Sequence, residues 1–361
     1  METPRGPRVA QEQSQEHLAD QGKQPTGAEQ LPSAMRVAGA PHIHGMVLTT
    51  RGAMIDVLIG LTPVLVAAVA VFRWYAARQV AVCVVSCLLA EAIFTAMRRR
   101  PFSLGDCSAA VTGMILAFSL PWSAPWYVGA IGSFAAIGLG KCAFGGLGQN
   151  IFNPAMVGRA FVMICFASAM GASAYVGAGG GLDVVTQATP LAAAKSAAAS
   201  GAASGPDWSL LWPLFLGNVN GSVGETSALA CIVGGLYLCL RRTASWETPL
   251  GMILAVAAIG GAGDLINPHH PLSVLHHLLG GAVMLGAFFI ATDPVSSPVT
   301  PRGRFIFGAG VGGLVMLMRA YSGYPEGVMF SVLLMNALTP LINRATIPRP
   351  VGGPVPVKGR T

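Results

Sequence analysis

The stretch MIDVLIGLTPVLVAAVAVF, residues 54–72, decides what kind of protein this is. It carries one charged side chain, Asp56, in an otherwise mostly apolar run. A helix needs about 20 mostly apolar residues to cross the hydrocarbon layer of a bilayer. A second such run, QVAVCVVSCLLAEAIFTAM at residues 79–97, follows after a short connection and also carries one charge, Glu91. Two such runs in succession predict a protein threaded through a membrane.

The composition of the whole chain agrees with this prediction. Of its 361 residues, 53% are apolar and 10% are charged, and the mean hydropathy is +0.60. A soluble domain carries about 25% charged residues, so this chain lacks the polar side chains needed to cover its own surface in water. The net charge of +7 does not indicate nucleic-acid binding, because the cations form short clusters between apolar runs and no continuous stripe.

Ten apolar runs are long enough, or nearly long enough, to cross the membrane. They are Met54–Phe72, Gln79–Met97, Ser108–Leu120, Trp126–Lys141, Ala155–Tyr175, Thr226–Leu240, Thr248–Gly261, Ser273–Thr292, Phe305–Met318 and Gly327–Ile342. A further run, Leu210–Val219, is too short to cross and is predicted to be re-entrant. We therefore expect an all-α polytopic membrane protein of about ten transmembrane helices, with the broken or re-entrant segments that surround sites in transporters.

Lysine and arginine predict the orientation, because the cytoplasmic loops of membrane proteins are enriched in both. With Arg98–Arg100 placed in the cytoplasm, alternating crossings put 15 of these cations on the cytoplasmic side and 4 on the outer side. Both termini are then cytoplasmic. The expected organisation is a disordered tail at 1–40, a membrane domain at 41–343 with an outer-face loop at 172–209, and a cytoplasmic tail at 344–361.

Four stretches interrupt the apolar runs: GGLGQNIFNPA at 145–155, GNVNGSVGETS at 217–227, ATDPVSSP at 291–298 and YSGYPEG at 321–327. Glycine and Asn-Pro favour helix breaks, and the backbone groups freed by a break are tolerated in a membrane only beside protein or a watery cavity. A simple turn between helices is the alternative for the first stretch. The sequence MNALTP at 335–340 echoes QNIFNP at 149–154, which suggests a two-half internal repeat.

Three carboxylates lie within or at the ends of apolar runs. Glu91 is inside a run, where a carboxylate is costly and is a functional candidate by default. It lies near the cytoplasmic end of the run, about two turns from Arg98, so snorkelling or helix pairing is the alternative. Glu225 opens a run and either caps a helix or contacts an ion or cofactor. Asp293 ends a run and either caps it or pairs with an arginine.

Two histidine pairs, His269-His270 and His276-His277, lack a nearby cysteine or acidic cluster, so we expect a structural role, with metal binding as the less favoured alternative. The segment 177–195 is rich in glycine and alanine. By composition it is a loop on the outer face, with a short helical piece after Pro190. Nothing in the composition distinguishes Thr189 from the neighbouring hydroxyl residues.

Several blocks occur together and in order: DCSAAVTG at 106–113, GGLGQNIFNPAMVG at 145–158, GETSALA at 224–230, ATDPVSSP at 291–298 and GYPEG at 323–327. In these blocks the chain resembles the NqrB/RnfD family, which are membrane subunits of the sodium-translocating NADH:quinone reductase and of the Rnf electron-transport complex. The resemblance runs from about Pro41 to Asn343. The short chain and compact tail favour the Rnf branch of the family.

The resemblance implies a covalent FMN, joined through its phosphate to a threonine in the motif Asp-x-x-(Ser/Thr)-Gly-Ala-Thr. The matching residues are Asp183, Thr186, Ala188 and the acceptor Thr189, while Gln187 replaces the usual glycine. A second, non-covalent flavin is left open. The resemblance also makes Glu91, Asp106 and Glu225 candidates for an ion path.

The implied function is that of a membrane subunit of an ion-translocating ferredoxin:NAD oxidoreductase in the bacterial inner membrane, which relays electrons and couples them to ion movement. Its expected partners are the other subunits of the complex and the lipid bilayer. We expect no catalytic residues in this chain alone, and no direct binding of NAD, ferredoxin or nucleic acid. A channel or permease for a small solute is the alternative, because broken helices and Asn-Pro turns suit that function as well.

Overall fold

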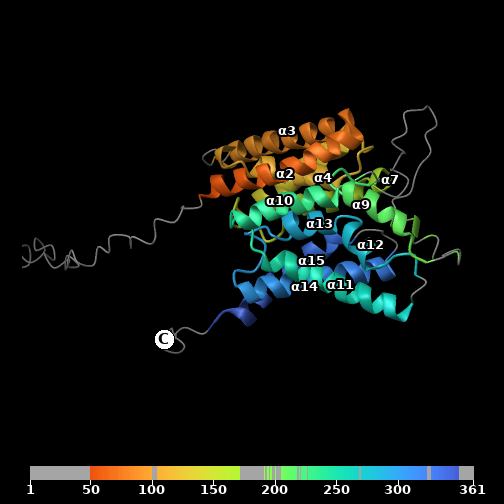
Figure 1. Ribbon diagram of the computed structural model, residues 1–361. Helices are drawn as coiled ribbons and strands as arrows, with labels where there is room; N and C mark the ends of the chain where they lie inside the picture. Colours follow the sequence, from red (N-terminus) through yellow and green to blue (C-terminus); the bar gives the residue numbers. More distant parts are fainter. Residues whose placement is uncertain are drawn as a thin grey trace, which may run out of the picture. The chain divides into compact units, whose positions relative to one another are not determined.

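The structure, a computed structural model, describes residues 49–99, 104–170, 205–217, 221–225, 227–267, 270–322 and 327–348, with six further positions between 191 and 219. The predicted tail at 1–40 and most of the predicted outer loop, including Asp183, Thr186, Ala188 and Thr189, lie outside the described residues. Within these residues, all regular secondary structure is helical apart from one isolated β-bridge (Figure 1). The predicted all-α class is confirmed for this part of the chain.

Five of the described helices are long and apolar enough to cross a membrane without interruption. They are α2 (Thr50–Phe72), α3 (Trp74–Met97), α11 (Glu247–Ile266), α14 (Pro301–Tyr321) and α15 (Val328–Thr346). The predicted bounds of α11 and α14 were too short, because polar or proline residues at the helix ends lie outside the apolar run that the prediction followed. Helix α15 likewise continues past residue 343, where the membrane domain was expected to end.

Other predicted spans are built from shorter pieces. The span Trp126–Lys141 is α5 (Trp126–Ala135) continued by a π-helix, η4 (Ala136–Cys142). The span Ala155–Tyr175 begins as α6 (Pro154–Cys165), breaks at Phe166 and resumes as α7 (Ala167–Met170). Residues 171–175 are not among the described ones.

The prediction of a single helix over Ser273–Thr292 is wrong. This segment consists of α12 (Val274–Leu279), α13 (Val283–Leu285) and a second π-helix, η7 (Gly286–Ile290). The break falls at Gly280-Gly281, where Gly281 has a φ of +70°, in the left-handed region that favours glycine.

Two half-length helices meet end to end inside the protein. Helix α4 (Ser108–Ser119) ends where the turn before α10 (Ala228–Leu240) begins. The N–H groups of Val223 and Gly224 donate to the carbonyls of Leu120 (3.0 Å) and Phe118 (2.7 Å). The freed backbone groups of one break therefore satisfy those of the other, as a membrane interior requires.

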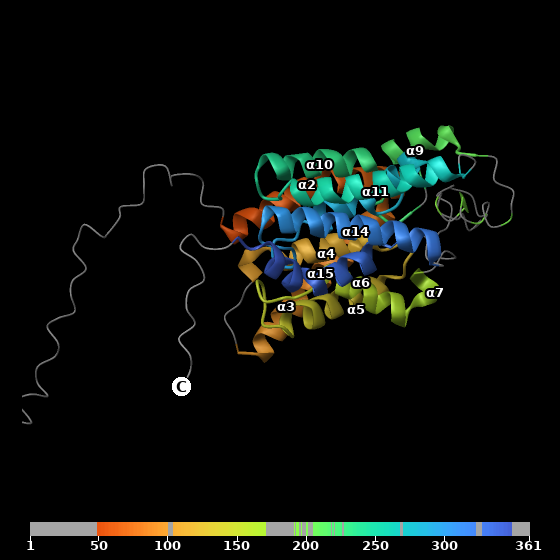
Figure 2. The ribbon, with the colours of Figure 1, turned by 90° about the horizontal axis from the view of Figure 1, so that it is seen from below.

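Helix α9 (Leu211–Leu216) occupies the run predicted to be re-entrant. Its six residues are too few to cross, and it packs against α10 and α12. Figures 1 and 2 both show α9 and α10 following one another, and in Figure 2 they lie along one edge of the helical unit.

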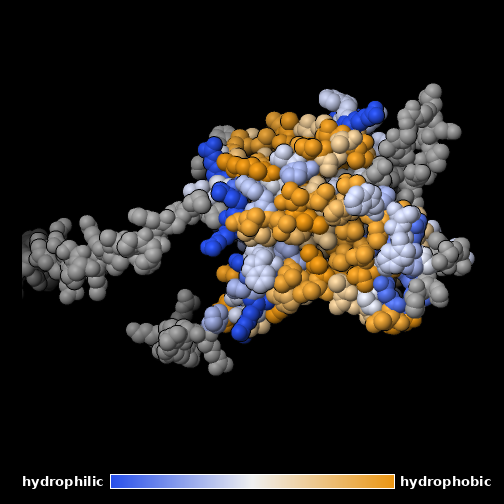
Figure 3. Space-filling view, in the orientation of Figure 1, coloured by the Kyte–Doolittle hydropathy of each residue, from blue (hydrophilic) through white to orange (hydrophobic). Residues whose placement is uncertain are grey.

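Glycine contacts bring the long helices close together. On α14, a Cβ added at Gly308 would lie 2.1 Å from the Thr248 carbonyl oxygen, and one at Gly312 would lie 2.5 Å from the Met252 oxygen. This G-x-x-x-G spacing lets α14 pack directly on the backbone of α11. Figure 3 shows apolar residues over the middle of the helices and hydrophilic residues gathered toward their ends, as expected for a multi-pass membrane protein.

Each of the two π-helices is followed by a loop and then by a helix that begins at a proline. After η4, a loop leads to α6, which begins at Pro154 with the Asn153 side chain as its N-cap. After η7, a loop leads to α14, which begins at Pro301 with Thr300 as its N-cap. The sequence echo between 149–154 and 335–340 does not correspond to this similarity, because residues 335–340 lie inside α15. The loop that follows η7 as GGLGQNIFNP follows η4 is ATDPVSSP.

Candidate functional site

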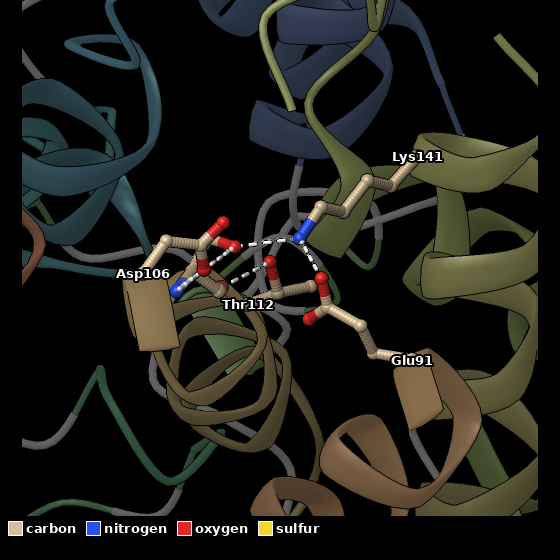
Figure 4. Close-up of polar contacts among 5 residues, drawn as sticks. Glu91, Asp106, Thr112 and Lys141 are labelled. Carbon is tan, nitrogen blue, oxygen red and sulfur yellow. Dashed lines mark hydrogen bonds and ion pairs between the residues drawn. The ribbon is translucent and has the colours of Figure 1, made fainter. Parts of the chain in front are cut away.

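A buried ion pair lies between the second half of α3 and the end of the π-helix η4. The Lys141 Nζ atom is 2.6 Å from Glu91 Oε1, and the two residues are 2% and 1% exposed (Figure 4). A charged side chain in a membrane interior is stabilised mainly by a partner of opposite charge. The pairing explains how both charged residues are accommodated in the buried interior.

A serine extends this pair toward a second carboxylate. Lys141 Nζ also donates to Ser108 Oγ at 2.6 Å, and Ser108 Oγ donates to Asp106 Oδ1 at 2.6 Å (Figure 4). The Ser108 N–H donates to the same Asp106 oxygen at 2.8 Å, and Thr112 Oγ1 donates to the Ser108 carbonyl at 3.0 Å. The Lys141 ammonium thus contacts Glu91 directly and is connected to Asp106 through the Ser108 hydroxyl. We call this hydrogen-bonded chain of Glu91, Lys141, Ser108 and Asp106 the central relay.

Lys141 was not recognised from the sequence as a site residue. It ends an apolar run and counts there as one of the cytoplasmic cations. The alternative partner for Glu91, Arg98, instead donates from Nη1 to the Cys142 carbonyl at 2.5 Å. The π-helical turn is visible only in three dimensions, and such turns occur often at functional sites.

A small cavity adjoins the central relay. It has a volume of about 80 Å³, and its polar wall includes Ser108, Thr112, Lys141, Asn150, Asn153 and Asp293. Since one water needs roughly 10–15 Å³ by this measure, the cavity has room for several waters or for a partly hydrated cation. Both loops that follow the π-helices contribute to its wall.

Asp293 in this wall fastens the loop after η7 through hydrogen bonds within the loop, whereas the sequence predicted a cap of the run that it ends or a pair with an arginine. Its carboxylate accepts from the Val295 N–H at 3.2 Å and from Ser296 Oγ at 2.8 Å. Of the two nearby arginines, Arg304 donates from Nε to the Pro298 carbonyl at 3.1 Å. Asp293 therefore shapes the loop that closes one side of the cavity.

Asn153 joins the two loops to each other. Its Oδ1 accepts from the Ala155 N–H at 3.0 Å, which caps α6, while its Nδ2 donates to the Ile290 carbonyl at the end of η7 at 3.2 Å. With the Asn336 amide oriented by its hydrogen bonds, its Oδ1 accepts from the Asn153 N–H at 3.0 Å. Asn336, on α15, is 1% exposed. Both asparagines belong to the two similar stretches at 149–154 and 335–340, but the sequence did not predict that they are in contact.

Glu225 is separate from the other two candidate carboxylates. It is 7% exposed and lies in the turn before α10, where its N–H donates to the Ser222 carbonyl at 3.0 Å. This turn pairs with the C-terminal end of α4, whereas Asp106 lies at the N-terminal end. The 12 residues of α4 span roughly 18 Å at about 1.5 Å per residue. The structure thus connects Glu91 and Asp106 at the N-terminal end of α4, whereas Glu225 lies near the C-terminal end of that helix.

A larger cavity opens at the other end of the long helices, between the last turns of α11 and α14 and the start of α12. Its volume is about 450 Å³, and its wall includes Leu191, His270, His277 and Arg319. Arg319 donates to the carbonyls of His277 (2.6 Å) and Gly280 (2.7 Å). We call this space the outer cavity.

The histidines near the outer cavity have structural contacts. His276 Nδ1 lies 2.8 Å from Ser273 Oγ in a capping box, and its Nε2 lies 2.9 Å from the Asp207 carbonyl. Among the residues the structure describes, no three His, Cys, Asp or Glu side chains are grouped closely enough to hold a metal ion.

The family model described as the NQR2, RnfD, RnfE family matches residues 36–352. The chain belongs to this family. The match covers the central relay, both π-helices and the segment that contains Thr189. The family indicated by the sequence blocks is therefore confirmed.

Curated members of the family match along nearly their whole length. The D subunit of the Na⁺-translocating ferredoxin:NAD⁺ oxidoreductase complex of Acetobacterium woodii is 42% identical over 320 residues, which is 88% of this chain and 95% of the relative. The D subunit of the proton-translocating ferredoxin:NAD⁺ oxidoreductase complex of Clostridium ljungdahlii is 38% identical over 318 residues, 86% of this chain and 94% of the relative. The D subunit of the ion-translocating oxidoreductase complex of Actinobacillus succinogenes is 36% identical over 350 residues, 88% of this chain and 98% of the relative.

Proposed function

We propose that this chain is the D subunit of an ion-translocating ferredoxin:NAD⁺ oxidoreductase complex, where it relays electrons and takes part in ion movement. The observation that carries the proposal is the family match over residues 36–352, together with 42% identity along nearly the whole of a relative with that name. Its partners are the other subunits of the complex. The names of the relatives favour this function over that of a solute permease.

We infer that Thr189 carries FMN through a phosphoester, within the motif that includes Asp183, Thr186 and Ala188. Bound flavin supplies one- and two-electron redox chemistry, while the protein sets its position and potential. The described residues are compatible with such a group. Leu191, two residues after the acceptor, lines the outer cavity, whose volume of about 450 Å³ lies within the range of about 300–1,000 Å³ typical of ligand sites.

The proposed ion path runs past the central relay. Glu91 and Asp106 offer carboxylate oxygens on either side of the Lys141 ammonium, and the adjoining cavity of about 80 Å³ gives a small cation room beside them. A cation that approaches Glu91 competes with the ammonium for the same oxygen atoms. Glu225, at the other end of α4, is the proposed continuation of the path.

The proposed location is the bacterial inner membrane, with both termini in the cytoplasm and the segment carrying Thr189 on the outer face. The count of 15 cytoplasmic against 4 outer cations supports this orientation. A membrane-impermeant thiol reagent should label Ser200→Cys from outside in intact cells, with the unsubstituted chain as background. Labelling only after the cytoplasm is exposed would reverse the orientation.

Flavin fluorescence in a denaturing gel tests the attachment. The full chain, produced together with a flavin transferase, should give a fluorescent band, and Thr189→Ala should abolish it. Ser196→Ala is the matched control and should stay fluorescent, because it removes a nearby hydroxyl that donates only to the Ala193 carbonyl (2.8 Å). A dark wild-type band would defeat the covalent flavin, and fluorescence that survives Thr189→Ala would move the acceptor to another residue.

A further inference from the structure

Four polar side chains follow one another along a single face of α15. Asn336, Thr339, Asn343 and Thr346 are three or four residues apart, which is the spacing that places side chains on one face of a helix. Asn336 is 1% exposed and Thr339 is 8% exposed. A buried polar side chain is costly unless it is hydrogen-bonded. We call these four residues the polar face of α15, and their partners show what the face does.

The polar face fastens the loop that follows η7 to α15. The Thr339 hydroxyl and the Asn336 amide nitrogen, oriented by its hydrogen bonds, both donate to the Ser296 carbonyl, at 3.0 and 3.2 Å. Two further hydrogen bonds join the end of the same loop to the end of the helix: Val299 N–H to Asn343 Oδ1 at 3.0 Å, and Thr300 Oγ1 to Thr346 Oγ1 at 2.6 Å. This loop therefore keeps three attachments to α15 when one of the four is removed.

Asn336 differs from the other three residues because it also bonds to the loop that follows η4. Its Oδ1 accepts from the Asn153 N–H at 3.0 Å, just before α6 begins at Pro154. Within the described residues, the other three members of the polar face make no hydrogen bond to that loop. One amide thus joins the two loops, with its oxygen atom on the first and its nitrogen atom on the second.

Both loops form part of the wall of the small cavity beside the central relay. The first loop contributes Asn150 and Asn153 to this wall, and the second contributes Thr292 and Asp293. Asn336 itself does not line the cavity. The gap between the loops therefore depends on a residue behind the wall, in the way that outer-shell hydrogen bonds hold the ligands of a bound ion in place.

We propose that Asn336 is a positioning residue for ion movement, because it fixes the gap between the two loops of this cavity. The inference rests on the proposed function, which places the ion path beside the central relay. The Asn336 side chain does not touch the ion. It sets the width of the space between the loops, and loss of its two bonds lets the loops move apart. Removal of such an outer-shell partner commonly weakens ion binding or activity about 10–100-fold.

Hydrogen–deuterium exchange of the full-length chain in detergent tests the link between the loops. Asn336→Leu keeps the branched shape of the side chain and removes both bonds, so peptides covering 149–157 and 291–299 should both exchange faster. The Asn153 N–H should exchange roughly fivefold faster, the usual effect of losing one hydrogen bond. Thr339→Val removes a bond to the second loop only and should leave 149–157 unchanged. Unchanged exchange over 149–157 in Asn336→Leu would overturn the proposal.

A second variant separates the two bonds of Asn336 from any general damage to the fold. Asn336→Asp keeps an oxygen atom that accepts from the Asn153 N–H and replaces the nitrogen atom that donates to the Ser296 carbonyl. It should therefore preserve slow exchange over 149–157 and speed up exchange over 291–299. Faster exchange over 149–157 in this variant would overturn the assignment of the oxygen atom to the first loop, and the proposal with it.

The number of ions taken up per NADH formed tests the consequence for function. The whole complex in membrane vesicles is given reduced ferredoxin and NAD⁺, and radioactive sodium and a pH-sensitive dye show which ion the wild type accumulates. Asn336→Leu should lower the ratio for that ion about tenfold. Ser331→Ala is the matched control on the same helix and should keep the wild-type ratio, because its hydroxyl donates to the Gly327 carbonyl (2.8 Å) and to neither loop. A general structural defect would lower electron flow and uptake together, and an unchanged ratio would overturn the proposal.

Glu91→Gln distinguishes failure of this proposal from failure of the proposed function. If Glu91→Gln loses uptake while Asn336→Leu keeps the wild-type ratio, the ion path stands and only the positioning role of Asn336 is overturned. If the wild type accumulates neither ion, or if Glu91→Gln keeps its uptake, the ion path beside the central relay is overturned and this proposal with it.

Discussion

In the central relay, the ammonium of Lys141 lies 2.6 Å from a carboxylate oxygen of Glu91, whereas in the outer cavity the guanidinium of Arg319 is held by the carbonyls of His277 and Gly280. A carboxylate neutralises a cation, but a carbonyl dipole stabilises it without cancelling its charge. The central pair therefore offers carboxylate oxygens that a cation could share with the ammonium, as the ion path proposed above requires. The outer wall is a fixed polar surface.

The largest expected effect comes from removing one partner of the Glu91–Lys141 ion pair in the central relay. Lys141→Met leaves the Glu91 carboxylate buried without its ammonium, and removal of one partner of a buried pair costs about 3–5 kcal/mol. We expect a marked fall in the unfolding temperature of the full chain in detergent. The double variant Glu91→Gln with Lys141→Met should recover most of that loss, because no uncompensated charge remains. A single variant as stable as the wild type would contradict the pairing.

The same variants test the ion path apart from electron transfer. Ion uptake driven by electron flow should be lost in vesicles whose complex carries Glu91→Gln, while the in-gel fluorescence of the subunit should persist. Thr189→Ala should give a dark band and should also lose the uptake, because the flavin on Thr189 is proposed to relay the electrons that drive it. Undiminished uptake with Glu91→Gln would remove Glu91 from the path.

The next effect concerns the helices that form the outer cavity. Gly308→Leu places a side chain where a Cβ alone would lie 2.1 Å from the Thr248 carbonyl oxygen, so α11 and α14 must separate. Overpacking of this kind costs about 1–3 kcal/mol. Thermal unfolding should show the loss. Gly313→Leu on the same helix is the control and should be close to neutral, because the nearest atom to its Cβ would be Ile259 Cδ1 at 3.9 Å.

The smallest effect sharpens the picture of the central relay. Ser108→Ala removes the hydroxyl between Lys141 and Asp106 and leaves the Glu91 contact in place. The expected cost is about 1 kcal/mol, the usual contribution of one such hydrogen bond. Thr62→Ala is the control, since the Thr62 hydroxyl donates only to its own helix, at the Leu58 carbonyl. Equal effects of the two substitutions on stability and ion uptake would mean that Ser108 is no part of the relay.

Sequence reasoning predicted the long crossings well and the broken ones poorly. Hydropathy identifies α2 and α3 because each is one continuous apolar run. It merged α12, α13 and η7 into one helix because leucine, valine and alanine surround Gly280-Gly281, and a left-handed φ of +70° at Gly281 leaves no mark on an average of hydropathy.

The candidate site divides in the same way. Glu91 was recognisable because a carboxylate within an apolar run is costly wherever the chain folds. Its partner was not, because Lys141 lies 50 residues away in the sequence. Arg98, the partner suggested by proximity along the helix, has a backbone carbonyl as its acceptor instead.

The sequence by itself determined that this protein lies in a membrane, that it is helical and which family it belongs to, because composition, run length and ordered motifs are properties of the chain alone. Only the tertiary structure decided that Lys141 neutralises Glu91 and that Leu191 lines the outer cavity. It also decided that the Val223 N–H group, in the turn before α10, donates to the Leu120 carbonyl at the end of α4. These are contacts between distant segments. They form because a membrane interior leaves no water to satisfy a charge or a free backbone group, so each must find its partner elsewhere in the fold.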